Sequence, residues 1–209
     1  MPDLKNEKVA IPLVIFAGIL WSFGPYVVRH IDQPHLIAWQ YLFARGIVIF
    51  LLLNLYLFFE EGKTFYKNYY KVGMSGLIGG CGLGMAMITF IWSITSTTAA
   101  ITLLCLAAMP FITALLGFLF LKEKISINVW ISISVAAIGL CVMAFESSVI
   151  GSVLGLLFGL FSALGFSIFS VSLRWRKETP KFTTVAIAGL FCCLFSLLVL
   201  IFQDLQFFS

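Results

Sequence analysis

The sequence has 209 residues, of which 61% are hydrophobic and 11% are charged, and its mean hydropathy is +1.08. A soluble domain of this size carries about a quarter charged residues, so this chain has too little polar surface to cover a globule in water. Its net charge of +4 comes from basic residues in short segments between apolar runs, which is typical of membrane orientation. The composition therefore predicts an integral protein of the lipid bilayer with no nucleic-acid partner.

Seven apolar segments are long enough to cross a bilayer, because a spanning helix needs about 20 residues. In chain order they are Val9–Val28, Leu36–Phe59, Val72–Ile94, Thr98–Leu121, Ile127–Phe145, Ile150–Trp175 and Thr184–Phe202. Membrane-spanning strands would alternate polar and apolar residues, and these runs do not alternate. The first segment lacks a small-residue cleavage site, so we interpret it as a helix and not as a signal peptide. We expect an all-α polytopic membrane protein, a helical bundle of about seven transmembrane helices.

Lysine and arginine residues gather at one end of the expected helices. Eleven of them lie in segments on the same side as the N-terminus: Lys5, Lys8, Lys63, Lys67, Lys71, Lys122, Lys124, Arg174, Arg176, Lys177 and Lys181. Arg29 lies on the opposite side, and Arg45 lies within the second span. Because Lys and Arg near helix ends resist translocation, we expect a multi-pass protein of the cell inner membrane with a cytoplasmic N-terminus.

The first and sixth spans share a glycine pattern. A shift of 141 positions places Gly18 on Gly159 and Gly24 on Gly165. A repeat that begins after five helices starts from the opposite side of the membrane, so it must be inverted relative to the first. Inverted repeats around a site near the bilayer midplane are the architecture of many secondary transporters.

Several motifs in a fixed order carry a likeness to a known family. They are GILWSFGPYVV in the first span, the arginine-bearing second span, STTAAITLLCLAAMPFITALLGFLFLKEKIS across the fourth, VWISISVAAIGLCVMAF in the fifth and GLLFGLFSALGFSIFSVSLRW in the sixth. With these motifs the chain resembles the EamA-type members of the drug/metabolite transporter superfamily over nearly its whole length. The resemblance implies ten helices in two inverted five-helix repeats. Here these would divide into a first repeat at residues 1–146 and the start of an incomplete second repeat at residues 147–209.

The sequence stops after the seventh of the ten expected helices. We expect either a fragment of a longer chain, which we favour, or a shortened protein that pairs with another chain. The resemblance implies a permease that moves small organic metabolites, such as amino acids, by alternating access and without a cofactor. No catalytic triad, paired carboxylates or metal-ligand cluster lies within the spans, so we expect no enzyme activity. The sequence leaves open a facilitator or an exchanger, a homo-oligomer, and a non-transporting scaffold or partner subunit.

Arg45 is a charged residue near the middle of the second span. Its insertion costs about 2.5–3.5 kcal/mol, so it should face the bundle or a water-filled cavity. The side chain can attract an anionic group of the substrate, such as a carboxylate, or it can bond carbonyls across the bundle as a structural residue. Tyr41, about one helical turn away, shares its face.

Two tryptophans are candidates for the wall of a substrate pathway. Trp21 lies in the middle of the first span beside Ser22, too deep for an interfacial anchor, and it either lines a cavity or packs in the core. Trp92 near the end of the third span and Trp39 near the start of the second suit belt anchors, and Trp92 can also face the cavity.

The fourth span combines a polar stripe with a proline. Thr98 and Thr102 lie on this stripe, and they either line the pathway or bond their own helix. Pro110 lacks an N–H and frees a carbonyl, which is tolerated only where protein or water satisfies that group. The following Glu123 is expected to order the exit turn together with its lysine neighbours.

Two sets of glycines have a spacing of four and predict close helix packing. They are Gly76, Gly80 and Gly84 in the third span, and Gly151, Gly155 and Gly159 in the sixth. We interpret both sets as structural.

The orientation can be tested with reporters fused within residues 174–181. We expect a cytoplasmic reporter to be active there and a periplasmic reporter to be inactive, because this segment is rich in basic residues. Periplasmic activity at this segment would contradict the whole helix assignment.

Overall fold

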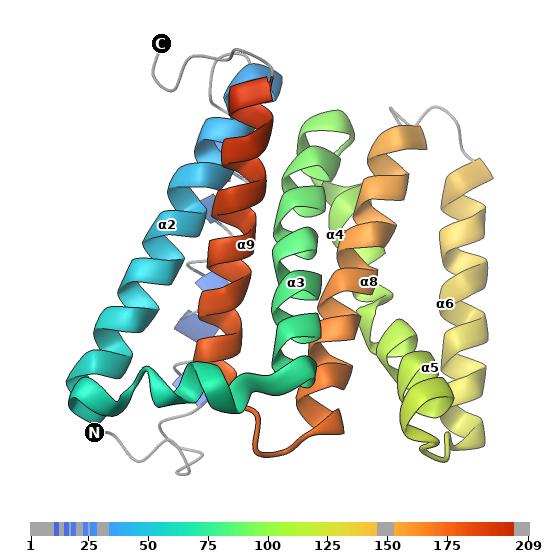
Figure 1. Cartoon of the computed structure of the whole chain (residues 1–209). Coiled ribbons are helices and arrows are strands. Elements are labelled where there is room, and N and C mark those ends of the chain that lie inside the picture. Colours follow the sequence, from blue (N-terminus) through green and yellow to red (C-terminus); the bar gives the residue numbers. More distant parts are fainter. Residues whose placement is uncertain are drawn as a thin grey trace.

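The computed structural model describes residues 11–12, 15–16, 18–19, 23–24, 26–28, 34–145 and 153–202. The described residues between 11 and 28 are helical. The remaining elements are the helices α2 (Pro34–Glu61), α3 (Lys67–Ser96), α4 (Ala99–Ala107), α5 (Met109–Leu121), α6 (Ile127–Phe145), α8 (Val153–Trp175) and α9 (Lys181–Phe202), with a short 3-10 helix η1 (Gly62–Thr64) (Figure 1). No strand occurs in this described part of the chain.

Five helices of the described part are long and apolar enough to cross a membrane: α2, α3, the combined segment Ala99–Leu121, α8 and α9. Helix α6 contributes a shorter apolar stretch, Ile127–Gly139. Large apolar side chains such as Leu52, Phe59 and Leu198 are exposed on the outside of the bundle, which suits a lipid environment and not water. The predicted all-α polytopic membrane protein is confirmed. The predicted span at residues 9–28 falls partly outside the described residues.

The basic turns lie at one end of the bundle. Figure 1 shows the turns that join α2 to α3, α5 to α6 and α8 to α9 at the same end, at the bottom of the view. They and the adjoining helix ends carry Lys63, Lys67, Lys71, Lys122, Lys124, Arg174, Arg176, Lys177 and Lys181. This is the arrangement on which the predicted orientation rests, and we refer to this end as the basic end.

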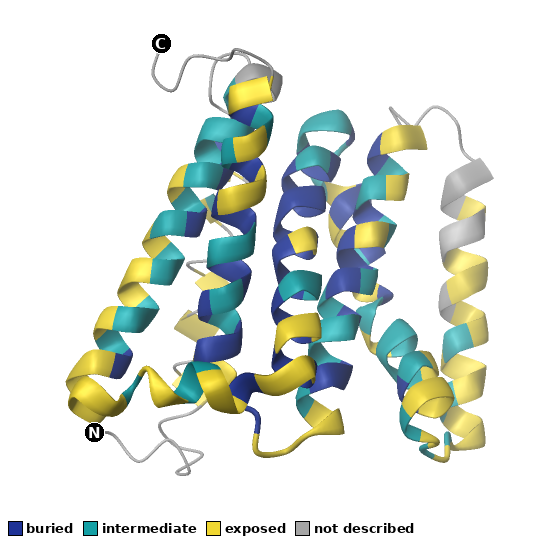
Figure 2. Cartoon of the chain, viewed as in Figure 1, coloured by how far each residue is buried: buried dark blue, intermediate teal, exposed yellow. Residues whose placement is uncertain are grey.

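Helix α3 is the most deeply buried span and lies between α8 and α9 (Figure 2). A methyl group added at Gly80 would lie 3.1 Å from the carbonyl oxygen of Thr184 in α9, and one added at Gly165 in α8 would lie 2.5 Å from the carbonyl oxygen of Gly82. The α3 backbone therefore touches both neighbours directly. The predicted packing role of the set Gly76, Gly80 and Gly84 is confirmed, because all three face α9 side chains.

The second predicted glycine set behaves in the same way where it is described. An added methyl group at Gly155 would lie 2.7 Å from Cβ of Thr97, and one at Gly159 would lie 2.9 Å from Cβ of Cys105. The start of α8 therefore packs closely against the end of α3 and against α4. Gly151 lies outside the described residues.

Helices α2 and α9 also cross backbone to backbone, and they run in opposite directions (Figure 1). An added methyl group at Gly46 would lie 2.7 Å from the carbonyl oxygen of Gly189 and 2.7 Å from the amide nitrogen of Cys193. Nearby, the thiol of Cys192 donates to the carbonyl of Leu42 at 3.6 Å. Sequence reasoning did not predict this crossing. Each of the two helices contains a single glycine, so neither shows the regular glycine spacing that indicates close packing.

Helix α3 begins with a segment that runs across the basic end before the helix turns into the bundle (Figure 1). The turn occurs at Gly73, whose φ of +59° and ψ of −169° form a conformation that is essentially restricted to glycine. A side chain at Gly73 would also collide with Arg176, because an added methyl group would lie 2.7 Å from a guanidinium nitrogen of that residue. The predicted start of this span at Val72 agrees with the position of the turn.

The fourth predicted span is divided into α4 and α5. Ala108 lies between them, and its carbonyl accepts from the amides of both Phe111 and Ile112 at 3.0 Å. Pro110 has no N–H to donate to the preceding turn, so the regular hydrogen-bond ladder stops there. The break faces α8, because the Ser167 hydroxyl of α8 donates to the Met109 carbonyl at 3.0 Å.

The glycine contacts lead to a stability prediction. Gly46→Ala should lower the free energy of unfolding by about 1–3 kcal/mol, because a methyl group has no space against the α9 backbone. Gly139→Ala in α6 is the matched control, since nothing lies within 4 Å of an added methyl group there and alanine favours helix. Unfolding in detergent, followed by tryptophan fluorescence, measures both. Equal stability of the two variants would contradict the crossing.

Candidate functional site

Aromatic side chains from four helices meet in the half of the bundle away from the basic end. The ring centroids of Trp39 in α2 and Trp92 in α3 are 5.3 Å apart. Phe158 of α8 lies 6.3 Å from Trp92, and Phe195 of α9 lies 5.9 Å from Trp39. We call these four residues the aromatic cluster. Trp39, which was expected to be an interfacial anchor, packs against Trp92.

Tyr41 lies close to the described helical residues between 11 and 28. Its hydroxyl oxygen would be 3.9 Å from a methyl group added at Gly24. Tyr41, Trp39 and Trp92 are half-buried and pack against the same buried core. Of the predicted pathway residues, Tyr41 and Trp92 thus pack against one shared core, from α2 and from α3. The predicted residues Trp21 and Ser22 lie outside the described residues.

Arg45 lies on α2 about 9 Å along the helix axis from Trp39, on the side of the basic end. It is half-buried, between the inward positions Leu42 and Gly46, which face α9. Within residues 34–145 and 153–202, the one ion pair joins Arg174 and Glu123, so Arg45 has no carboxylate partner there. A half-buried cation without a counter-ion can attract an anionic group that enters from outside the protein.

The predicted residues of the fourth span have structural partners. The Thr98 hydroxyl caps α4 by accepting from the amide of Ile101 at 3.3 Å. Thr102 is completely buried, and its hydroxyl bonds that of Ser93 in α3 at 2.8 Å. A substrate could reach Thr102 only by replacing this bond. Pro110, which is exposed, stands in the first turn of α5.

Buried hydroxyl groups on α3 and α8 bind backbone carbonyls of neighbouring helices. Ser93 donates to the Gly155 carbonyl at 2.8 Å, and Ser162 donates to the Ala86 carbonyl at 3.0 Å. Ser167 adds the bond to Met109 at the break between α4 and α5. Sequence reasoning missed these bonds. The sequence feature that could have predicted these bonds is a small residue at each turn of α8, on the face that carries Gly155 and Gly159.

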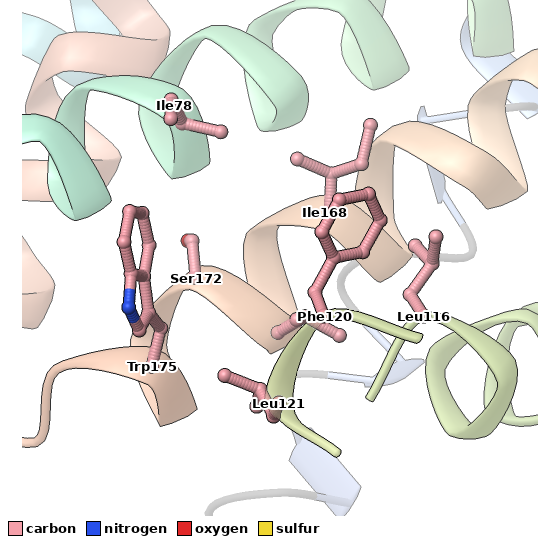
Figure 3. Close-up of a pocket in the computed structure, with 8 residues that line it drawn as sticks. Ile78, Leu116, Phe120, Leu121, Ile168, Ser172 and Trp175 are labelled. Atoms are coloured by element: carbon pink, nitrogen blue, oxygen red, sulfur yellow. The ribbon is translucent and has the colours of Figure 1, made fainter. Parts of the chain in front are cut away.

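A cavity of about 540 Å³ opens between α3, α5 and α8 near the basic end (Figure 3). It is lined by Ile78, Leu116, Phe120, Leu121, Ile168, Val171, Ser172 and Trp175. Figure 3 shows the labelled side chains arranged around the open space, with Trp175 and Phe120 on different sides of it. Sequence reasoning did not predict the cavity. No group of three His, Cys, Asp or Glu residues in the described part of the chain could hold a metal ion.

An ion pair joins α8 to the turn after α5. A guanidinium nitrogen of Arg174 lies 3.1 Å from a carboxylate oxygen of Glu123, and Arg174 also donates to the Thr113 carbonyl at 3.4 Å. Gly117 leaves room for both groups, since an added methyl group would lie 2.7 Å from each of them. Glu123 was expected to order the exit turn with its lysine neighbours, but the ion pair that it forms is with Arg174. Its ion-pair partner is on another helix.

Comparisons with known proteins agree with this architecture. The profile of a family described as the EamA-like transporter family matches residues 8–145, which is more than half of the chain. A protein of Bacillus subtilis (strain 168), named "Uncharacterized transporter YojE", is 26% identical over 170 residues. The aligned part covers 78% of this chain and 54% of that protein, so the chain spans about half the length of this relative. No solved structure gives a significant match.

The ion pair can be measured with double-mutant cycles. Because both side chains are about half exposed, we expect a coupling energy of about 0.2–1 kcal/mol between Glu123→Gln and Arg174→Gln, which decreases at high salt. Glu123→Gln combined with Lys124→Gln is the matched control and should show no coupling. Coupling to Lys124 and none to Arg174 would contradict the observed pairing.

Proposed function

Because the chain belongs to the EamA-like transporter family, we propose that it moves a small organic metabolite that carries a carboxylate, such as an amino acid, across the cytoplasmic membrane. Family membership supports a membrane transporter. The position of Arg45 carries the substrate proposal. It is a half-buried cation on a spanning helix, without a carboxylate partner in the described residues.

The surroundings of Arg45 favour an anion with an apolar body. Trp39 and Tyr41 lie about one to two turns away on the same helix, and Trp92 contacts Trp39. A carboxylate held by Arg45 would place the rest of the substrate toward these aromatic rings. Arg offers a planar fork of donors that matches the two oxygens of a carboxylate. We include Trp21 and Ser22 of the first helix in the proposed pathway because Tyr41 lies close to that helix, at Gly24.

We further propose that transport proceeds by alternating access. The antiparallel contact of α2 with α9 supports this idea, because it pairs the second helix of the first expected repeat with the second helix of an inverted one. The break between α4 and α5 at Pro110 offers a hinge next to α8. The bond between Thr102 and Ser93 keeps α4 attached to α3 during such a movement, and Thr98 caps the start of α4.

The orientation and the energy source complete the proposal. The basic end faces the cytoplasm of an inner membrane, since its turns are rich in Lys and Arg. No Asp or Glu lies in the middle of the described spans. We therefore favour facilitated diffusion or exchange of the substrate over proton coupling through a carboxylate of these helices.

Counterflow of labelled amino acids into proteoliposomes tests the proposal. Arg45→Gln should raise the apparent KM for a carboxylate substrate roughly tenfold or more, because a hydrogen bond to a charged group contributes about 1.5–3 kcal/mol. Arg45→Lys should give a smaller increase, since lysine keeps the charge but lacks the planar fork. Lys63→Gln, in the turn at the basic end, is the control and should leave KM unchanged.

An unchanged KM in Arg45→Gln would remove this residue from the proposed site. Absence of flux for a broad panel of metabolites, together with a protein that co-purifies stably, would favour the scaffold or partner-subunit alternative.

A further inference from the structure

The cavity between α3, α5 and α8 takes no part in the proposed substrate site. Its lining is apolar apart from the hydroxyl of Ser172 and the indole N–H of Trp175 (Figure 3). That hydroxyl already donates to the Phe169 carbonyl at 2.8 Å within its own helix. An occupant therefore meets mainly hydrocarbon walls, and none of the lining residues is charged. A volume of about 540 Å³ is within the range of small-ligand sites, about 300–1,000 Å³.

Cations follow the lining residues at the basic end. Lys122 comes directly after Leu121, and Arg176 comes directly after Trp175. Both are exposed, and neither forms an ion pair within the described part of the chain. The guanidinium group of Arg176 also lies against Gly73 of α3, the third helix that lines the cavity. Its charge is therefore close to the end of α3 at the basic end. Arg174 differs from them, because Glu123 already neutralises it.

We propose that this cavity binds an acyl chain of an anionic phospholipid, whose phosphate lies between Lys122 and Arg176. An apolar space with cations at one end matches an amphiphile with an anionic headgroup. Basic pockets between transmembrane helices bind such headgroups on the cytoplasmic side. Trp175, which is exposed and lines the cavity, lies where an interfacial aromatic ring is expected.

The position of the charges favours a phospholipid over a further helix as the occupant. A packed helix would need to cover Leu116, Phe120 and Ile168, and it would also need acidic residues placed against the two cations at the mouth. A phospholipid satisfies both parts of the surface at once. It is also present at high concentration where the basic turns meet the bilayer.

Fluorescence quenching in nanodiscs tests the proposal. The full chain is placed in phosphatidylcholine with increasing fractions of phospholipid brominated on its acyl chains, carrying either a phosphatidylglycerol or a phosphatidylcholine headgroup. The signal of Trp175 is isolated by subtracting the signal of a Trp175→Phe variant. We expect brominated phosphatidylglycerol to quench Trp175 at a several-fold lower fraction than brominated phosphatidylcholine.

Two variants separate the headgroup from the acyl chain. Lys122→Gln with Arg176→Gln should abolish the preference for phosphatidylglycerol and leave quenching itself intact. Val171→Phe should reduce quenching by both lipids because it fills the cavity, whereas Val142→Phe on the exposed face of α6 should not. The charge variant replaces only exposed residues, so the test remains decisive if Val171→Phe fails to fold.

Equal quenching by the two lipids in the unmodified chain would overturn the proposal. Relief of quenching by inorganic phosphate would indicate an anion site without an acyl chain, and relief by a transported amino acid would assign the cavity to the substrate pathway. Either result would also overturn it. None of these outcomes depends on Arg45, so the substrate proposal is tested separately.

Discussion

The backbone of α3 lies directly against α8 and α9 because glycines occupy the contact positions, and a similar glycine contact joins α2 to α9. Lipid tails are as apolar as leucine, so helix association in a membrane depends on such close packing and on interhelical hydrogen bonds. Both are present here. The contact of Gly82 with Gly165 places Ser162 beside the Ala86 carbonyl, where it donates a hydrogen bond at 3.0 Å.

The proposed site follows from this packing. Trp92 stands near the far end of α3, and the α3–α8 contact brings Phe158 within 6.3 Å of it. The α2–α9 crossing at Gly46 places Arg45 beside the contact and Trp39 against Trp92. A shift of either pair of helices would separate these side chains. The residues that we propose for binding are thus positioned by glycine contacts between the helices.

Much of this fold could be predicted from the sequence, because membrane helices need long apolar runs and glycine ridges need a regular spacing. A single residue was less informative where it is compatible with more than one backbone structure. Pro110 predicted a lost hydrogen bond and a freed carbonyl, but not that one helix ends at Ala107 and another begins at Met109. The apolar cavity and the Glu123–Arg174 ion pair join α5 to α8 across about 50 residues, with no signal at either position. Such long-range contacts follow only from the three-dimensional packing.

A disulfide cross-link tests the position of α3 most directly. The hydroxyls of Ser75 in α3 and Thr179, just before α9, are buried and 2.7 Å apart. In a variant without native cysteines, Ser75→Cys and Thr179→Cys should form a disulfide under mild oxidation in native membranes, detected after cleavage at a protease site inserted between them. Ser134→Cys on the exposed face of α6 should form none with Thr179→Cys. Efficient cross-linking of the first pair alone supports the packing of α3 against the segment between α8 and α9. Its absence would contradict the packing on which the proposed site depends.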